Sequence, residues 1–266
     1  MHSVSYHRAV SVNEAVNKVK GSEGKFLSGG MTLIPAMKTR LASPSEVVDL
    51  SHIADLKGIK VSGDTVTIGA ATTHNEVATD AALKKAAPAV AYLASHIGDP
   101  HVRHRGTIGG SIANNDPAAD YPAAMLALGA TIVTNSREIA ADDFFTGLFE
   151  TALGDGEMVT AVRFKVPTKA GYAKFPNPAS RYAMTGVFVA QGAGGVRVAV
   201  AGAGENGVFR ASGLESALSK SFDGSALDGA KVEASSLMGD IHASPEYRAN
   251  LVVVMAKRAV AQANGK

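Results

Sequence analysis

The sequence predicts an α+β fold in three consecutive parts, residues 1–55, 56–168 and 169–266. Strand-like and helix-like segments alternate in the first two parts, which is the pattern of packed layers of helices and strands. Residues 158–166 then alternate with a period of two, and Pro167 ends this strand. After this strand the pattern of apolar residues changes. It predicts two apolar strands around a glycine-rich turn, and helices follow them.

The first part is interpreted as a small α/β unit. Ser11 and Glu14 form the S-x-x-E pattern of a capping box, and apolar residues follow at helical spacing. Residues 25–28 predict a short strand that enters a glycine loop, and residues 33–41 predict a helix. The apolar run at 47–50 predicts a buried strand.

The second part is interpreted as a larger α+β unit. Residues 66–70 and 130–134 have strand character, and residues 88–96 predict a helix. Thr73 and Glu76 form another capping box at the start of a helix. Between residue 98 and about residue 122 we expect irregular structure.

The third part predicts an antiparallel sheet with helices. Residues 187–190 and 196–200 flank the glycine-rich segment 192–195, which is typical of a β-hairpin. Ser244 and Pro245 are suited to the cap and first position of a helix, and an apolar stripe lies on one face of the residues that follow.

Composition excludes several classes of site. The chain has no cysteine, so it holds no disulfide, cysteine-ligated iron–sulfur cluster, cysteine nucleophile or cysteinyl flavin link. Its net charge of +2 and the lack of Lys/Arg-rich runs argue against nucleic-acid binding. The N-terminus lacks the apolar core of a signal peptide, and no apolar stretch is long enough for a transmembrane segment. We therefore expect a cytoplasmic protein.

The first glycine loop lies in residues 27–35, LSGGMTLIP. A strand, paired glycines and a helix start follow one another there. Consecutive main-chain N–H groups in such a turn form an anion-binding nest that suits a pyrophosphate, and Thr32 can add a hydroxyl donor. A tight turn without a ligand is the alternative, and it is the simpler interpretation of one double glycine alone.

The second glycine loop, RGTIGGSIA at 105–113, precedes acidic residues that include Asp120. A carboxylate at this position suits the hydroxyl groups of a ribose or a ribityl chain. Asp120 can also cap a helix predicted over 122–128, and both roles can coexist. Two phosphate-type loops in separate parts predict a long ligand, such as a dinucleotide, in the cleft between them.

These motifs resemble those of the FAD-binding medium subunits in the xanthine dehydrogenase and carbon monoxide dehydrogenase family, which are molybdenum hydroxylases. The first motif reads SGGMTLIPAMK at 28–38. The second reads RHRGTIGGSIA at 103–113 and leads into DPAADYP at 116–122. Further similarity lies in residues 143–160 and 175–183, so the resemblance covers nearly the whole chain.

The resemblance implies a two-part FAD-binding domain of the PCMH type, followed by the antiparallel C-terminal domain. FAD would lie between the first two parts, with the flavin reaching towards the third. The first loop would wrap the pyrophosphate, the second would contact the adenosine side, and Asp120 would bind cofactor hydroxyls. Ile97 and Val159 would border the flavin or the adenine, and Lys174 would lie near the flavin ring. The implied cofactor-binding residues are Ser28, Gly29, Gly30, Met31, Thr32, Leu33, Ile97, Thr107, Gly109, Gly110, Ser111, Asp120, Val159 and Lys174.

The resemblance also implies an electron-transfer role without an acid–base catalyst or a metal site in this chain. Substrate would be oxidised on a large molybdopterin subunit, and electrons would pass through two [2Fe–2S] clusters on a small subunit. FAD would deliver them to a quinone, NAD or oxygen. A dimer of such heterotrimers is the expected assembly. The substrate stays open between carbon monoxide, purines, aldehydes and N-heterocycles.

Other interpretations of the sequence remain. The chain can be a self-sufficient FAD oxidase or dehydrogenase, or an assembly subunit that has lost its cofactor. Residues 202–207 fit G-x-G-x-x-G, but we interpret them as a strand followed by a turn because no helix clearly starts there. His96, Asp99, His101 and His104 fit no standard zinc spacing, and we expect solvated or backbone-bonded histidines. Arg181 and Tyr182 are left unassigned because the spacing there varies.

Overall fold

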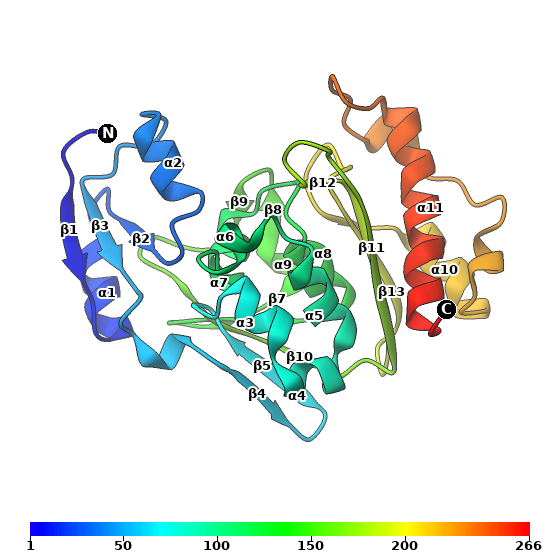
Figure 1. Cartoon of the computed structure of the whole chain (residues 1–266), viewed down its shortest axis with the longest axis horizontal. Coiled ribbons are helices and arrows are strands. Elements are labelled where there is room, and N and C mark those ends of the chain that lie inside the picture. The colour runs from blue at the N-terminus through cyan, green and yellow to red at the C-terminus, as the bar shows by residue number, and fades with distance from the viewer.

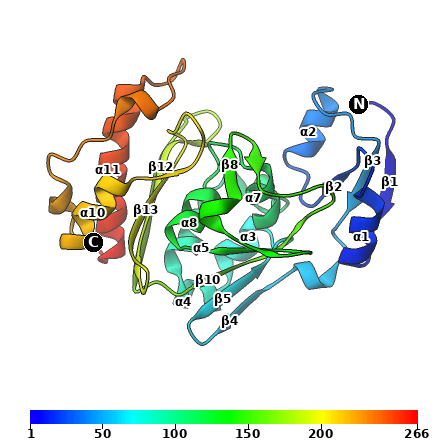
Figure 2. The ribbon, with the colours of Figure 1, turned by 180° about the vertical axis from the view of Figure 1, so that it is seen from behind.

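The computed structural model describes all 266 residues and contains three main sheets, which follow one another along the molecule in chain order (Figure 1). The view from behind shows the same order, with the C-terminal helices at the opposite end from the N-terminus (Figure 2). We call the three parts the first, second and third units, residues 1–55, 56–168 and 169–266. None of the helices is both long and apolar enough to cross a membrane.

The first unit contains a parallel sheet with the strand order β1-β3-β2. Its strands are β1 (Ser5–Arg8), β2 (Lys25–Leu27) and β3 (Glu46–Asp49), and its helices are α1 (Val12–Val19) and α2 (Leu33–Lys38). Ser11 caps α1 as predicted, accepting from the Glu14 N–H. The second half of the capping box is wrong, because the Glu14 carboxylate accepts from the N–H of Val10 instead.

The second unit contains an antiparallel sheet with the order β4-β5-β10-β6-β7. The capping box of Thr73 and Glu76 is confirmed at the start of α3. The strands are β4 (Ile59–Ser62), β5 (Thr65–Gly69), β6 (Thr131–Thr134), β7 (Glu138–Ala140) and β10 (Val159–Lys165), with a small hairpin of β8 (Phe145–Gly147) and β9 (Glu150–Thr151). The helices include α3 (His74–Thr79), α4 (Ala81–Ala86), α5 (Pro88–Ser95) and α9 (Ala141–Phe144).

The irregular structure expected between residues 98 and 122 is wrong. This stretch contains α6 (Pro100–Arg103) and α7 (Ile108–Asn114), and α8 (Tyr121–Ala127) follows directly. Side chains of Asp99 and Thr107 cap the first two helices. Glycine lowers intrinsic helix propensity, so the sequence around the pair Gly109–Gly110 does not predict a helix at α7. Tertiary packing overrides this, because a Cβ at Gly109 would come 2.5 Å from the Ala70 Cβ.

The third unit contains an antiparallel sheet with the order β11-β12-β13-β14. The predicted hairpin is confirmed as β12 (Ala183–Gly192) and β13 (Gly195–Ala201), and β11 (Lys169–Pro176) and β14 (Phe209–Arg210) flank it. The helices are α10 (Ser212–Lys220) and α11 (Pro245–Ala263), and Ser244 caps α11 as predicted. Short 3-10 turns lie at Ala54–Leu56, Gly224–Leu227 and Ala234–Ser236.

The G-x-G-x-x-G segment at 202–207 follows β13 and leads into the short strand β14. The next helix begins only at Ser212. The interpretation as a strand followed by a turn is therefore confirmed.

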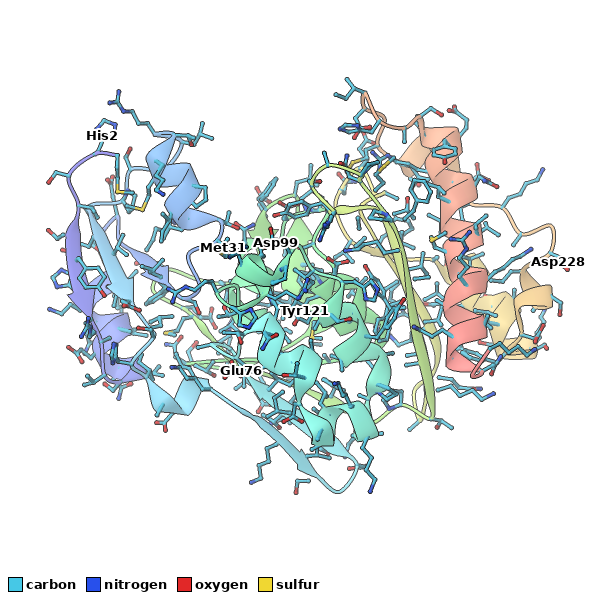
Figure 3. The ribbon with its side chains drawn as sticks, in the orientation of Figure 1. His2, Met31, Glu76, Asp99, Tyr121 and Asp228 are labelled. Atoms are coloured by element: carbon cyan, nitrogen blue, oxygen red, sulfur yellow. The ribbon has the colours of Figure 1, made fainter.

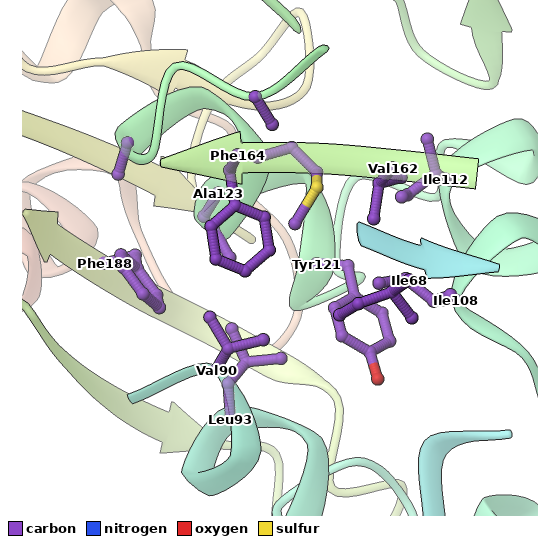
Figure 4. Close-up of a cluster of buried hydrophobic side chains, with 14 of the residues drawn as sticks. Ile68, Val90, Leu93, Ile108, Ile112, Tyr121, Ala123, Val162, Phe164 and Phe188 are labelled. Carbon is purple, nitrogen blue, oxygen red and sulfur yellow. The ribbon is translucent and has the colours of Figure 1, made fainter. Parts of the chain in front are cut away.

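The third sheet is buried on both faces, which explains why β12 is apolar without alternation. Phe188 and Ala190 face the largest core, which also contains helices and strands of the second unit (Figure 4). Val187 and Val189 point the other way, into a core shared with α10 and α11. The predicted boundary at residue 168 thus separates two sheets but not two independent cores.

Candidate functional site

A cavity of about 760 Å³ lies where the first and second units meet, and residues 179–182 of the third unit also line it. Ligand-binding cavities commonly have this size. Met31 of the first unit and Asp99 of the second, both labelled in Figure 3, line it. The cavity brings together every cofactor-binding residue implied by the sequence except Lys174.

The loop between β2 and α2 contributes a row of free donors. The main-chain N–H groups of residues 29–32 make no hydrogen bond within the chain, although all four residues line the cavity. Gly30 has a φ of 73°, a left-handed conformation that favours glycine and lets successive N–H groups converge. Consecutive free N–H groups of this kind form an anion-binding nest.

The second glycine segment contacts the first one directly. The hydroxyl groups of Ser28 and Thr107 lie 2.9 Å apart. A Cβ at Gly29 would overlap the carbonyl oxygen of Arg105, so the absence of a side chain permits this close approach of two backbones. The two motifs therefore form one continuous wall of the cavity.

The second segment offers fewer free main-chain donors than the first, and its role as a phosphate-type loop stays a prediction. Ile108 and Gly109 donate their N–H groups to the carbonyls of Thr72 and Ala70, and Gly110 donates to the Thr107 hydroxyl. These donors are used because Gly109 and Gly110 form the first turn of α7, which packs against the second sheet. Gly110 is exposed and offers the cavity a surface without a side chain.

Asp120 lies on the cavity wall just before α8 and is 4% exposed. Its carboxylate does not cap α8, so the alternative role as a helix cap is wrong. Instead Oδ1 accepts from the Tyr172 hydroxyl and lies 2.9 Å from the Lys174 Nζ. Burial raises the pKa of Asp120, and the charge of Lys174 and the Tyr172 hydrogen bond oppose this by lowering it.

Lys174 lies behind Asp120 and does not line the cavity. Its side chain is only 6% exposed, and its ammonium group donates a second hydrogen bond to the carbonyl of His96 at 2.8 Å. The expectation that Lys174 lies near the flavin ring stays a prediction, and its ammonium group faces the buried carboxylate of Asp120. The buried carboxylate and the carbonyl draw the ammonium group away from the open space.

Ile97 and Val159 contribute to an apolar part of the cavity, together with Leu50, Leu56 and Leu153. The cavity thus combines an anion-binding loop, a buried carboxylate and an apolar surface. This combination suits an elongated ligand with a charged middle, hydroxyl groups and a flat ring.

The sequence analysis missed His74, which lines the cavity and is 5% exposed. Its Nδ1 is buried without a hydrogen-bond partner, and its ring packs 5.4 Å from that of Tyr121. Burial and the nearby Arg103 lower the pKa of His74 to about 4. The capping pattern placed His74 at the start of a helix, but no local signal showed that this helix faces a cavity.

Glu157 is a second cavity residue that the sequence analysis missed. Arg137, the N–H of Gly154 and the hydroxyls of Thr134 and Ser136 all donate to its carboxylate. These hydrogen bonds, that of Arg137 above all, lower the pKa of Glu157 to about 2. Because its oxygens are already engaged, Glu157 serves to hold the wall together.

Arg181 and Tyr182, which the sequence left unassigned, both line the cavity from the turn between β11 and β12. Arg181 has a φ of 64°, and its N–H donates to the carbonyl of Asn177. The turn therefore brings the third unit to the cavity.

The histidines near residue 100 contact the backbone. The Nδ1 atoms of His96 and His104 lie 2.8 and 2.7 Å from the carbonyls of Tyr92 and Pro100. The expectation of backbone-bonded histidines is confirmed for these two. No group of three or more potential metal-ligating side chains occurs in the structure.

Residues 2–168 match the family described as the FAD binding domain in molybdopterin dehydrogenase. The chain is 36% identical over 281 residues to the carbon monoxide dehydrogenase medium chain of Afipia carboxidovorans, with 99% of this chain and 98% of the relative covered. It is 33% identical to the nicotine 6-hydroxylase medium subunit of Paenarthrobacter nicotinovorans, with coverages of 99% and 98%.

Solved structures agree with these sequence relatives. The structure of a Cu,Mo-CO dehydrogenase in its cyanide-inactivated form contains a chain with a TM-score of 0.89 and 35% identity, covering 99% of this chain and 98% of that one. A chain of quinoline 2-oxidoreductase from Pseudomonas putida 86 has a TM-score of 0.88 and 26% identity, with the same coverages.

Proposed function

Because the chain belongs to the family of FAD-binding domains in molybdopterin dehydrogenases, we propose that its cavity holds FAD and that the chain transfers electrons within a heteromeric molybdenum hydroxylase. The observation that carries the assignment of the cavity is the row of free N–H groups at residues 29–32. Such a row provides the donors that a pyrophosphate needs where it is removed from water.

The rest of the cavity fits the same cofactor. Asp120 presents a carboxylate, which accepts hydrogen bonds from hydroxyl groups of a ribose or a ribityl chain. The apolar side chains of Ile97 and Val159 provide surface for a ring system. Gly110 also lines the cavity and contributes no side chain to it.

When bound, FAD supplies the capacity to accept and release electrons singly or in pairs. The residues of this chain bind the cofactor, orient it and exclude water from it. No acid–base residue of the chain is assigned to the reaction. Ser28 and Thr107 join the two glycine motifs, which form the wall on which the cofactor would lie.

We further propose the partners. Relatives at 36% and 33% identity are named as medium chains or medium subunits, a term that implies larger and smaller companions. A large subunit with the molybdenum cofactor would oxidise the substrate, and a small subunit with two [2Fe–2S] clusters would pass electrons to this chain. A dimer of these heterotrimers is the proposed assembly. The absence of cysteine in this chain requires the clusters to lie elsewhere.

The proposal is tested by adding FAD to the purified chain, removing unbound cofactor by gel filtration and recording the flavin absorption. We expect retention near one flavin per chain. Gly110→Leu should weaken retention at least about tenfold, because Gly110 lines the cavity and a Cβ there would come 2.9 Å from the Thr107 hydroxyl, which also contacts Ser28. Gly213→Leu is the matched control, because nothing lies within 4 Å of a Cβ at this helix position.

The same measurement is then made on the chain produced together with its partner subunits. This second measurement tests for an FAD site that is complete only in the assembled complex. A complex that retains molybdenum and iron but no flavin would refute the proposal and favour a cofactor-free assembly subunit. Oxidation of a substrate by the isolated flavin-loaded chain would favour a self-sufficient oxidase or dehydrogenase.

A further inference from the structure

Asp120, Tyr172 and Lys174 form a buried cluster behind the cavity wall. Tyr172 and Lys174 lie two residues apart on β11, so both side chains point to the same face of the third sheet. Asp120 reaches them from the second unit, just before α8. The exposed fractions are 1% for Tyr172 and about 5% for the side chains of Asp120 and Lys174.

Only one member of the cluster reaches the cavity. Asp120 lines it, whereas Tyr172 and Lys174 do not. Both partners contact the same carboxylate oxygen, Oδ1, which leaves Oδ2 as the oxygen available to a ligand. Lys174 is itself fixed by its second hydrogen bond, to the carbonyl of His96.

We propose that Lys174 and Tyr172 are positioning residues that act on the cofactor through Asp120, by keeping its carboxylate ionised and its free oxygen directed into the cavity. This inference rests on the proposed function, because it assigns the cofactor hydroxyl groups as the ligand of that oxygen. It replaces the direct contact of Lys174 with a flavin ring by an indirect role. It also gives the third unit a part in cofactor binding, since both positioning residues belong to β11.

The charge balance of the cluster explains why two partners are present. A carboxylate removed from water is unfavourable unless it is paired and hydrogen-bonded. Burial raises the pKa of Asp120, and Lys174 and Tyr172 counteract this. The other titratable groups that interact with Asp120 are His96, Tyr121 and Tyr182. Burial raises the pKa of both tyrosines, and the negative charge of Asp120 adds to this effect.

Removing Lys174 leaves the effect of burial unopposed by a cation, so the Asp120 carboxyl would take up a proton nearer to neutral pH. A protonated carboxyl is a weaker acceptor for hydroxyl groups, and its own O–H needs an acceptor. Cofactor affinity in such a variant should therefore depend on pH, falling as the pH falls through the raised pKa. In the parent chain Lys174 opposes the effect of burial on the pKa of Asp120, so the affinity should depend less on pH over the same range.

The test is a titration of FAD into the full chain from pH 6 to 9, for the parent and for Lys174→Met, Tyr172→Phe, Asp120→Asn and the double variant Asp120→Asn/Lys174→Met. We expect Lys174→Met to bind at least about tenfold more weakly at pH 7 and to recover as the pH rises. Tyr172→Phe should lose affinity by a smaller factor. Asp120→Asn should bind weakly without this pH dependence, and the double variant should match it.

Lys169→Met is the matched control, because Lys169 lies on the same strand but is exposed, and its ammonium group donates to Asn264 and lies over the ring of Phe222. It should bind FAD like the parent chain. Thermal unfolding of each variant checks the fold. If Lys174→Met does not fold, the double variant carries the comparison, because it removes both buried charges together.

Three outcomes would overturn the inference. Equal affinity of Lys174→Met and the parent at every pH would make Lys174 purely structural. A weaker but pH-independent affinity of Lys174→Met would exclude an action through ionisation. A double variant that binds FAD much more weakly than Asp120→Asn would show that Lys174 acts independently of Asp120. Failure of the parent chain and its complex to bind FAD would instead refute the proposed function, and the inference with it.

Discussion

His74 shows at the scale of one residue how the cavity shifts the protonation of a side chain. Burial lowers its pKa to about 4, whereas an unfolded histidine titrates near 6.5. Between these two values the unfolded chain binds a proton that the folded chain does not bind. Folding stability therefore falls as the pH drops from 6.5 towards 4.

We predict that the chain without added flavin loses about 2 kcal/mol of unfolding free energy at His74 between pH 7.5 and pH 5. His74→Gln should remove this part of the pH dependence, because glutamine does not titrate. Urea unfolding at a series of pH values measures the difference. Parallel pH profiles for the two proteins would show that His74 is not neutral in the folded state.

At the scale of elements, one asparagine joins the end of α7 to the hairpin of β8 and β9. Asn115 has a φ of 42° and ends α7, and its Nδ2 donates to the carbonyls of Gly147 and Glu150, each at 2.8 Å. The N–H of Phe149 donates to the Asn115 carbonyl. This attachment matters for the site because Phe149, at the tip of the hairpin, lines the cavity.

Asn115→Gly keeps the left-handed backbone accessible but removes both side-chain hydrogen bonds. We expect hydrogen exchange in residues 145–151 to become roughly tenfold faster or more, since each bond contributes about 1 kcal/mol. Exchange in α11 should stay unchanged and serves as the internal control. Unchanged exchange in the hairpin would show that its own strand pairing holds it.

At the scale of the whole molecule, the cavity exists because two units meet through their backbones. Gly29 and Arg105 approach too closely for any side chain at position 29. Ser28 and Thr107, 79 residues apart in sequence, bridge the same contact. The core of the first unit reinforces it, because Ala71 and Met158 of the second unit pack within that core.

Gly29→Ala should therefore separate the two units and cost about 1–3 kcal/mol or more, as overpacking does. A differential scan should show the melting temperature lowered by several degrees. Gly194→Ala is the control, because a Cβ there meets nothing within 4 Å. An unchanged melting temperature in Gly29→Ala would contradict this prediction. It would show that the contact between the units adjusts to the added methyl group without loss of folding stability.

The sequence by itself determined the elements whose signals are local. The capping residues Ser11, Thr73 and Ser244, the period-two strand at 158–166 and the hairpin around 192–195 all depend on neighbours a few residues away. The strand–glycine–glycine–helix order likewise predicted the loop at 28–33. These patterns can be recognised in the sequence because each is stabilised by hydrogen bonds or burial within one element.

Only the tertiary structure decided the features that depend on distant partners. Helix α7 forms despite two glycines because Gly109 packs on Ala70, and this contact has no sequence signature. Sheet packing likewise decided that Lys174 faces a buried carboxylate from another unit instead of the cavity. Position along a strand fixes which face a side chain takes, but what covers that face depends on segments far away in the chain.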